Sequence, residues 1–330
     1  MCPKFVPLPL PLTTKLPTLS QCCQLLSFNG PTSLSMVQAP PPAITQPGQV
    51  LVKVMAANVN PLDVMMSKGY GKEVLGNLRS VEGVIGGSDL TSTFPMVLGR
   101  DLSGEVVSIG RGVTSVRVGE SVWGATFPST QGSHQEYCLA DQGSLATKPD
   151  NLSHVEAASL PYAGLTAWAA ITQAGCVNRE VGQFSRVLVL GAGGGVGGIA
   201  TQLLARYYQS EVIAVAAGDA HPAVCAQGAS ITLDYTHSDY QAQLASLPPL
   251  DLVLDCAGVG RAALPLARLL RPGGRVVTLT SPVLKHSINR DRRSRSKKTG
   301  SPPQCRCKID SVFSTPTRET CNRGVPFIPP

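Results

Sequence analysis

A glycine-rich segment in the second half of the chain has the residue types and the spacing to bind phosphate. Six of the eight residues from 191 to 198 are glycine, and Gly193, Gly195 and Gly198 fit the pattern Gly-x-Gly-x-x-Gly. Glycine allows a sharp turn and lets the backbone approach a pyrophosphate closely. A helix that starts after such a turn offers unpaired N–H groups and the positive end of its dipole. The segment predicts a dinucleotide-binding turn, with a flexible loop as the alternative.

The residues around the turn predict the elements that must position it. A Val- and Leu-rich run precedes it, and apolar residues at helical spacing follow from Ile199. This alternation continues to about residue 280. We expect strands at 187–190, 211–216, 231–233, 251–255 and 275–280, and helices at 197–208, 222–227, 238–247 and 261–270. Alternating strands and helices predict an α/β fold with a doubly wound parallel sheet.

The first half of the chain has a different pattern. Residues 24–150 contain short apolar runs separated by turns with Gly and Pro, which predicts a barrel-like domain of β-strands. Residues 1–23 hold no acidic residue and are expected to form a disordered or targeting leader.

A helical region connects the two patterns, at residues 151–184. Ser153 and Glu156 have the spacing of a capping box at a helix start. Pro161 is expected to end that helix, and a second helix is expected over 166–174.

Composition limits the remaining possibilities. The 330 residues suffice for two domains, and no apolar run is long enough for a membrane span. The net charge is +7, but residues 285–330 hold 11 Lys and Arg against 3 Asp and Glu, so the rest of the chain is nearly balanced. We expect this basic tail to be disordered, and nucleic-acid binding by it is the less favoured alternative because no aromatic residues interleave its basic run. Ten scattered cysteines without a Cys-x-x-Cys pair indicate free thiols in a reducing compartment.

Five segments in a fixed order resemble a known family. They are residues 56–63, 98–105, 118–123, 159–168 and the glycine turn. Together they resemble the medium-chain dehydrogenase/reductase superfamily, in particular its zinc-free quinone oxidoreductases, and most of all the mitochondrial reticulon-interacting branch. The resemblance implies a GroES-like β-barrel domain for substrate over 24–150 and a Rossmann domain for NADPH over 151–284. Residues 285–330 do not resemble the usual continuation, so the Rossmann sheet is expected to be truncated at its C-terminal end, with an exposed edge strand.

The resemblance also assigns residues to the chemistry. Zinc-dependent relatives carry Cys and His where this chain has Asn60 and Arg100, and neither replacement ligates zinc, so no metal is expected. Asn60 and Thr166 match family residues at the nicotinamide end, with a turn residue and a plain helix residue as the alternatives. Tyr70 is a weaker candidate for donating a proton or hydrogen bond to a substrate oxygen, because a structural role is common for tyrosine.

The choice of nucleotide rests on the residues after the turn. NAD-specific sites usually carry an acid about 20 residues beyond the glycines. Ala217 stands there, with no carboxylate to repel a 2′-phosphate, although Asp219 is near. The resemblance assigns Tyr235 to that phosphate, so NADPH is the expected cofactor. The expected cofactor-binding residues are Thr166, Gly193, Gly194, Gly195, Val196, Gly197, Ala217, Tyr235, Cys256 and Leu279.

These expectations combine into one function and one alternative. The function is an NADPH-dependent, zinc-independent oxidoreductase that transfers hydride to a quinone or an activated enone. The alternative is a catalytically inactive or unstable truncated isoform that acts, if at all, as an interaction protein. The resemblance further implies a mitochondrial location, with a cytoplasmic one as the alternative, and a homodimer. No nucleic-acid partner is expected.

Overall fold

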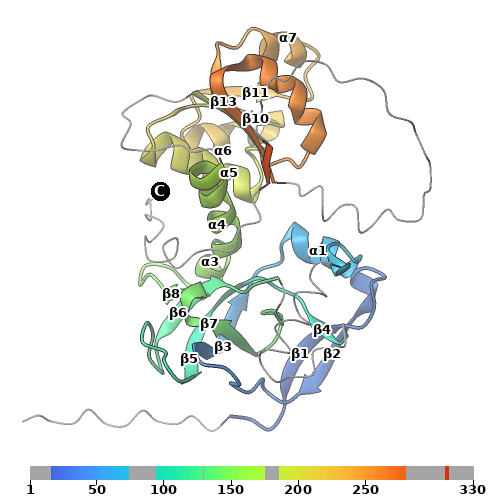
Figure 1. Cartoon of the computed structure of the whole chain (residues 1–330), viewed down its shortest axis with the longest axis vertical. Helices are drawn as coiled ribbons and strands as arrows, with labels where there is room; N and C mark the ends of the chain where they lie inside the picture. The colour runs from blue at the N-terminus through green and yellow to red at the C-terminus, as the bar shows by residue number, and fades with distance from the viewer. Residues whose placement is uncertain (1–15, 74–93, 129, 175–185, 280–308, 312–330) are drawn as a thin grey trace, which may run out of the picture. The chain divides into compact units, whose positions relative to one another are not determined.

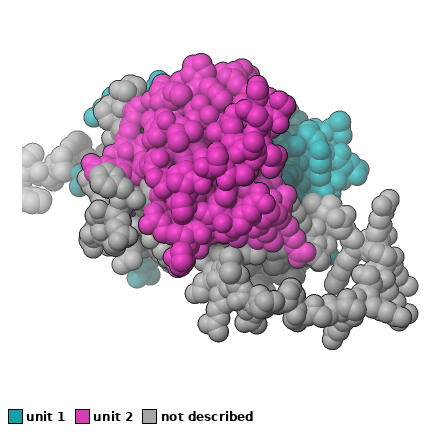
Figure 2. Space-filling view, turned by 90° about the horizontal axis from the view of Figure 1, so that it is seen from above, with its two compact units in different colours: residues 1–162 teal, residues 163–330 magenta. Residues whose placement is uncertain are grey.

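The computed structural model describes residues 16–73, 94–128, 130–174, 186–279 and 309–311. The chain divides into two compact units, residues 1–162 and 163–330 (Figure 2). Within the described part of the chain, no helix combines the length and the apolar character that a membrane span needs.

The first unit contains two antiparallel sheets (Figure 1). The larger has the order β7-β3-β5-β6-β8, and the smaller has the order β2-β1-β4. The strands are β1 (Ser20–Leu25), β2 (Leu34–Ala39), β3 (Gln49–Ala57), β4 (Met96–Val97), β5 (Asp101–Ile109), β6 (Ser121–Ala125), β7 (Tyr137–Asp141) and β8 (Leu145–Thr147). Val50, Val52 and Leu102 from neighbouring strands are fully buried in one apolar core, which confirms the predicted β domain.

Strand β1 corrects the expected leader. Ser20 pairs with Ala39 and Leu25 with Leu34, and the Cys22 side chain is buried. Residues 20–23 therefore belong to the folded β domain, because their main chain pairs with β2 and the side chains of Ser20 and Cys22 are buried. Residues 1–15 lie outside the described residues.

Helices of the first unit begin where the sequence places caps. Helix α1 (Pro61–Ser67) starts at a proline, whose missing N–H is not needed in the first turn. Helix α3 (His154–Ala158) has the predicted capping box of Ser153 and Glu156. The first unit extends past residue 150, because α3 packs against β3 and β5. Two short 3₁₀ helices, η1 (Pro31–Ser33) and η2 (Gln142–Ser144), complete the unit.

The second unit is organised around one parallel sheet of order β11-β10-β9-β12-β13-β14. Its strands are β9 (Arg186–Leu190), β10 (Glu211–Ala216), β11 (Ile231–Asp234), β12 (Leu250–Asp255), β13 (Leu270–Thr278) and β14 (Ile309–Ser311). Along β9, Val187 and Val189 enter one apolar core and Leu188 and Leu190 enter another, since successive side chains point to opposite faces. This two-sided burial confirms the predicted Rossmann-type sheet.

Helices cover both faces of this sheet (Figure 1). One core includes residues of η3 (Ala170–Ala174), α5 (Gly195–Gln202), η5 (Leu203–Tyr207) and α6 (His221–Ala226). The other includes residues of α7 (Tyr240–Ala245) and η7 (Gly260–Leu269). A short 3₁₀ helix, η6 (Gly218–Ala220), precedes α6.

Two helix expectations need correction. Helix α4 (Pro161–Ala169) begins at Pro161, five residues before the expected start at Thr166, because proline is favourable in the first turn of a helix. It continues into η3, a π-helical turn. The segment expected as an α-helix at 261–270 forms the 3₁₀ helix η7, which contains Pro265 and so lacks one main-chain donor.

The edge of the parallel sheet differs from the expectation. Val276, Val277 and Thr278 of β13 pair in parallel with residues 309–311 of β14. The expectation of an exposed edge at β13 is therefore wrong, and so is the expectation of disorder for these three tail residues. The rest of residues 280–330 lies outside the described part of the chain.

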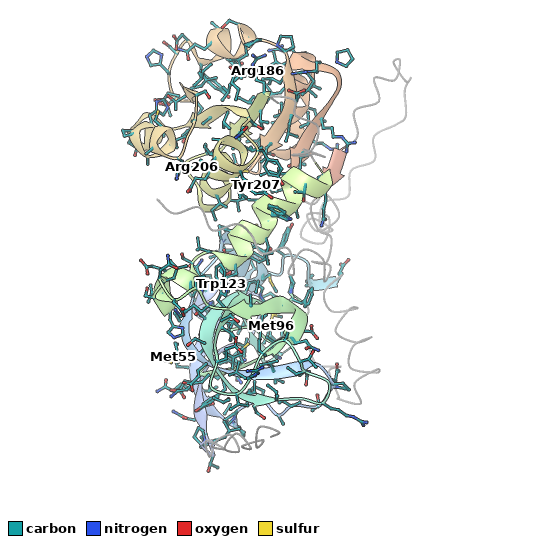
Figure 3. All side chains as sticks on the ribbon, turned by 90° about the vertical axis from the view of Figure 1, so that its left-hand side faces the viewer. Met55, Met96, Trp123, Arg186, Arg206 and Tyr207 are labelled. Atoms are coloured by element: carbon teal, nitrogen blue, oxygen red, sulfur yellow. The ribbon has the colours of Figure 1, made fainter. Side chains whose placement is uncertain are left out.

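At the amino-terminal ends of these parallel strands, charged side chains form ion pairs and hydrogen bonds. The Arg186 guanidinium lies 2.7 Å from the Glu211 carboxylate, and the Arg186 main-chain nitrogen donates to Asp251 at 2.7 Å. Figure 3 labels Arg186, the first residue of β9, and Arg206 and Tyr207 of η5.

Candidate functional site

Two glycines of the turn after β9 are required by the backbone itself. Gly191 has a φ of 74°, a conformation that favours glycine. A Cβ on Gly197 would lie 2.1 Å from the carbonyl oxygen of Gly191, and a Cβ on Gly191 would lie 2.9 Å from the main-chain nitrogen of Ala257. The turn is thus a closely packed connection between strand and helix, as dinucleotide binding requires.

The middle of the turn is open. Gly193, Gly194 and Gly195 are exposed, and Gly194 is the N-cap of α5. A Cβ on Gly195 would meet nothing nearer than the Ala163 Cβ at 4.0 Å. The first N–H groups of an α-helix, here including Val196, have no acceptor within the helix. This exposed surface of main-chain donors fits a pyrophosphate, because no side chain fills the space that the anion needs.

The remaining candidate cofactor residues of the second unit, except for Thr166, follow the carboxyl ends of the strands of the same sheet. The turn follows β9, and the ends of β10, β11, β12 and β13 are followed by Ala217, Tyr235, Cys256 and Leu279. The carboxyl ends of parallel strands are where open α/β sheets bind ligands. The structure therefore brings together five groups that the sequence separates by almost a hundred residues. Thr166 lies half-buried on α4.

Hydrogen bonds fix this edge. The main-chain nitrogens of Gly191 and Ala192 both donate to Val215 of β10 at 3.0 Å, and that of Cys256 donates to Leu190 at 3.0 Å. Burial raises the pKa of the Cys256 thiol above its ordinary value, so the thiol is neutral. Cys256 thus contributes a neutral side chain to this edge and no nucleophile.

The carboxylate of Asp234, the last residue of β11, lies beside the segment that follows β10. Ala216 of β10 pairs with Asp234 of β11, and a Cβ on Gly218 would lie 2.6 Å from an Asp234 oxygen. Hydrogen bonds from the Thr236 hydroxyl and main chain hold the pKa of Asp234 below its usual value, with further help from His221. Residues 216–218 carry no acid in the sequence, as stated above, but strand pairing brings the Asp234 carboxylate next to Gly218.

The first unit holds a second group of polar residues, around Asn60. The Asn60 amide nitrogen donates to Asp101 at 2.7 Å, and the Asn58 amide nitrogen donates to the same oxygen at 3.3 Å. The other Asp101 oxygen accepts from the Tyr162 main-chain nitrogen at 2.5 Å. Asp101 is fully buried and Asn60 nearly so. Both Asp101 and Tyr162 stand in the segments that carry the family resemblance, but neither has a sequence signal for this contact.

A buried cation lies beside these residues. Arg100 has no exposed surface, and its guanidinium donates to the carbonyl oxygens of Phe127, Thr130 and Val97. Its Nε lies 4.0 Å from an Asp63 oxygen. Burial lowers the pKa of Arg100, and the Asp63 charge opposes this. Arg100, for which the resemblance implies a zinc-ligating His in zinc-dependent relatives, is thus a buried cation paired with Asp63.

Two tyrosines lie with this buried group. Tyr70, a candidate from the sequence, is buried. Burial raises the pKa of Tyr162 to about 12, opposed by Arg100 and increased by the charges of Asp63 and Asp101 and by Tyr70. The Tyr162 phenol is therefore a proton-bearing group at neutral pH. Asn60 and Tyr70 belong to the first unit, whereas Thr166 and the glycine turn belong to the second.

Comparison with known proteins agrees with both units. Residues 46–150 match the family described as alcohol dehydrogenase GroES-like domain. The structure is similar to a quinone oxidoreductase from Coxiella burnetii, with a TM-score of 0.71 and 28% identity over 92% of this chain and 86% of that chain. An alcohol dehydrogenase superfamily protein from Novosphingobium aromaticivorans is 30% identical, with a TM-score of 0.65 over 78% of this chain and 72% of that one. The chain belongs to the medium-chain dehydrogenase/reductase superfamily.

Two further relatives show which branch of this superfamily the chain is similar to. The NAD(P)H oxidoreductase RTN4IP1, mitochondrial, of Bos taurus is 40% identical over 253 residues, which cover 76% of this chain and 62% of the relative. The reticulon-4-interacting protein 1, mitochondrial, of Caenorhabditis elegans is 38% identical over 230 residues, 70% of this chain and 61% of the relative. The chain thus spans a little over six-tenths of the length of the curated relatives it matches.

Proposed function

We propose that this protein is an NADPH-dependent oxidoreductase that transfers hydride to a quinone or an activated enone without zinc. The observation that carries the proposal is the exposed glycine turn at the N-terminus of α5, on the ligand-binding edge of a parallel sheet. The names of the relatives, NAD(P)H oxidoreductase and quinone oxidoreductase, support the same chemistry.

The chain's own residues would bind, orient and exclude water. Gly193, Gly195, Val196 and Gly197 would hold the pyrophosphate through main-chain N–H groups, and Gly194, whose N–H donates to Gly191 at 3.1 Å, would let the pyrophosphate approach because it has no side chain. Cys256 and Leu279 would line the edge toward the nicotinamide with Thr166. The bound nucleotide supplies the hydride, and the protein supplies the position. Asn60 would donate a hydrogen bond to the substrate oxygen, on which negative charge develops as hydride arrives.

Zinc independence is supported by what occupies the two ligand positions. The Asn60 amide is committed to Asp101, and Arg100 is a buried cation paired with Asp63. A guanidinium repels a metal ion and offers it no lone pair. Polarisation of the substrate oxygen would then come from hydrogen-bond donors.

The preference for NADPH is supported by Ala217, which carries no acid, and by Tyr235, which is 57% exposed at the end of β11. Asp234 acts against this preference through its charge. One of its oxygens accepts from both the hydroxyl and the main-chain nitrogen of Thr236, which favours the charged form, so the preference for NADPH rests on Ala217 and Tyr235.

The decisive experiment is turnover of the purified full chain with NADPH and with NADH, against a panel of ortho-quinones, para-quinones and enones. We expect NADPH oxidation that depends on the acceptor, survives EDTA and needs no added zinc. Loss of turnover after EDTA with recovery on zinc would overturn zinc independence. Absence of both turnover and NADPH binding would overturn the enzyme in favour of an inactive interaction protein.

Two further proposals follow from the relatives. Their names include a mitochondrial location, and we infer the same compartment for this protein. Imaging of the tagged full chain beside mitochondrial and cytosolic markers tests this inference. A homodimer stays a prediction, for which sedimentation equilibrium is the measurement.

A further inference from the structure

We propose that Asp101 is a positioning residue that holds the Asn60 amide so that one of its hydrogens is presented to the substrate oxygen. The inference rests on the proposed function, because it adds a residue to the hydride-transfer site. Its own basis is a set of buried contacts in the first unit.

The hydrogen bond between the Asn60 and Asp101 side chains has a defined direction, with Asn60 as the donor. The Asn60 amide nitrogen lies 2.7 Å from the Asp101 carboxylate, and Asp101 is fully buried. A carboxylate only accepts hydrogen bonds, so the amide nitrogen and not the amide oxygen must face it. Burial raises the pKa of Asp101, while the donors Asn60, Tyr162 and Asn58 act in the opposite direction and favour the charged acceptor.

The rest of Asn60 is held by α1. The Asn60 main-chain nitrogen donates to the Asp63 carboxylate at 2.8 Å, and the Asp63 main-chain nitrogen donates to the Asn60 carbonyl oxygen at 2.9 Å, so the main chain of Asn60 is fixed at the start of α1. An asparagine amide has two hydrogens. One is given to Asp101, and the second has no acceptor among the described residues. It is therefore the group left to bind an incoming oxygen.

The main chain near Asn60 is fixed from two sides. The His134 ring lies 3.0 Å from the carbonyl oxygen of Asn58, and the Gly99 main-chain nitrogen donates to Asp63 at 2.9 Å. With the main chain held, the orientation of the Asn60 amide is the remaining freedom, and Asp101 decides it. A group that is aimed before the reaction stabilises developing charge better than one that must reorient.

The test is the near-isosteric change Asp101→Asn. The new side chain keeps an oxygen for the Tyr162 main-chain nitrogen, and turns an amide nitrogen toward the Asn60 amide nitrogen. Either the hydrogen bond between the two side chains is lost, or the Asn60 amide rotates so that its oxygen and nitrogen exchange places. In both cases no oriented N–H remains for the substrate oxygen. We expect kcat to fall about 10- to 100-fold, as for loss of one oriented donor, with KM for NADPH within about 2-fold of the wild type.

A double variant separates positioning from stability. Asp101→Asn with Asn60→Asp restores a donor–acceptor pair between the two positions, but it leaves no hydrogen for the substrate. We expect Tm to recover while kcat stays low. Recovery of kcat together with Tm would overturn the proposal, as would an Asp101→Asn variant with unchanged kcat.

The matched control is Ser133→Ala, which removes a hydrogen bond to the main-chain oxygen of Asp101 at 2.6 Å and leaves the carboxylate untouched. It should lower Tm and leave kcat within about 2-fold, since it touches no oriented donor. The Asn60 side-chain N–H signals in ¹⁵N NMR give a readout that needs no turnover. A downfield hydrogen that disappears in Asp101→Asn supports the anchoring even if the wild type reduces no quinone, in which case the proposed function fails and the contact does not.

Discussion

At the scale of single residues, the site depends on where a few hydrogens lie. The Asn60 amide donates a hydrogen bond to the buried Asp101. Tyr162 keeps its proton because burial raises its pKa to about 12. Both groups are neutral hydrogen-bond donors, which suits chemistry that stabilises an oxyanion without a metal.

Asn60→Ala is the direct test of the proposed donor. We expect kcat to fall about 100-fold, with a loss of stability of about 1 kcal/mol from the missing hydrogen bond to Asp101. Steady-state kinetics with the best quinone, beside a urea unfolding curve, measure both. The exposed Asn151→Ala serves as the matched control and should change neither. A kcat near that of the wild type would remove Asn60 from the chemistry.

Tyr162 gives a pH dependence with a definite sign. Its pKa is raised to about 12 from 10.0, so the neutral phenol stabilises the fold below pH 10 and this contribution is lost as the pH rises toward 12. Between pH 9 and pH 11, Tyr162→Phe should lose about 1 kcal/mol less unfolding free energy than the wild type. Urea unfolding at the two pH values measures the difference, and equal losses would contradict the assigned burial.

At the scale of elements, the glycine turn combines two separate functions. Gly191 and Gly197 allow β9 and α5 to approach, whereas Gly193 to Gly195 keep the start of α5 exposed and free of side chains. The register between β10 and β11 also affects the charge near the turn, because it places Asp234 beside Ala216, the last residue of β10.

Two alanine substitutions in the turn should therefore have opposite effects. Gly197→Ala places a Cβ 2.1 Å from a carbonyl oxygen and should cost about 2–4 kcal/mol of stability. Gly195→Ala meets no neighbour closer than 4.0 Å, so its stability should change by less than about 0.5 kcal/mol, while NADPH affinity falls about 10-fold. Thermal melts and NADPH fluorescence titration measure the pair. Equal affinity in Gly195→Ala would argue against a phosphate at this turn.

Asp234→Asn tests the control of nucleotide choice. Removing the charge beside Gly218 should raise the ratio of kcat/KM for NADPH to that for NADH about 3- to 10-fold, because a 2′-phosphate is repelled by a carboxylate. Asp239→Asn, an exposed acid of the same unit that pairs with His237, is the control. An unchanged ratio would show that Asp234 has no influence on the 2′ position.

At the scale of the whole molecule, the question is whether the chain binds its cofactor as a folded protein. Strand β14 extends the parallel sheet beyond β13, so the sheet of the second unit has six strands among the described residues. NADPH at about 100 times its Kd should stabilise the chain by about 2.7 kcal/mol. A cooperative melt that NADPH raises more than NADH is the expected result. A melt unaffected by either nucleotide would favour the inactive alternative.

The sequence by itself determined the local features of this protein. The βα alternation, the glycine turn and the Ser153 capping box follow from propensity, spacing and main-chain geometry, which act within a few residues. For the same reason, the second unit's strands lie within a few residues of their predicted places, and β13 deviates most because its first residues are not a simple apolar run.

Only the tertiary structure decided which distant residues meet. The Asp101 contact with Asn60 spans 41 positions, and the approach of Asp234 to Gly218 depends on the register of β10 and β11. Strand β1, inside the expected leader, forms only because β2 and β4 supply partners for its main chain. Such contacts depend on how whole helices and strands pack against one another. A local sequence pattern does not determine the energy of that packing.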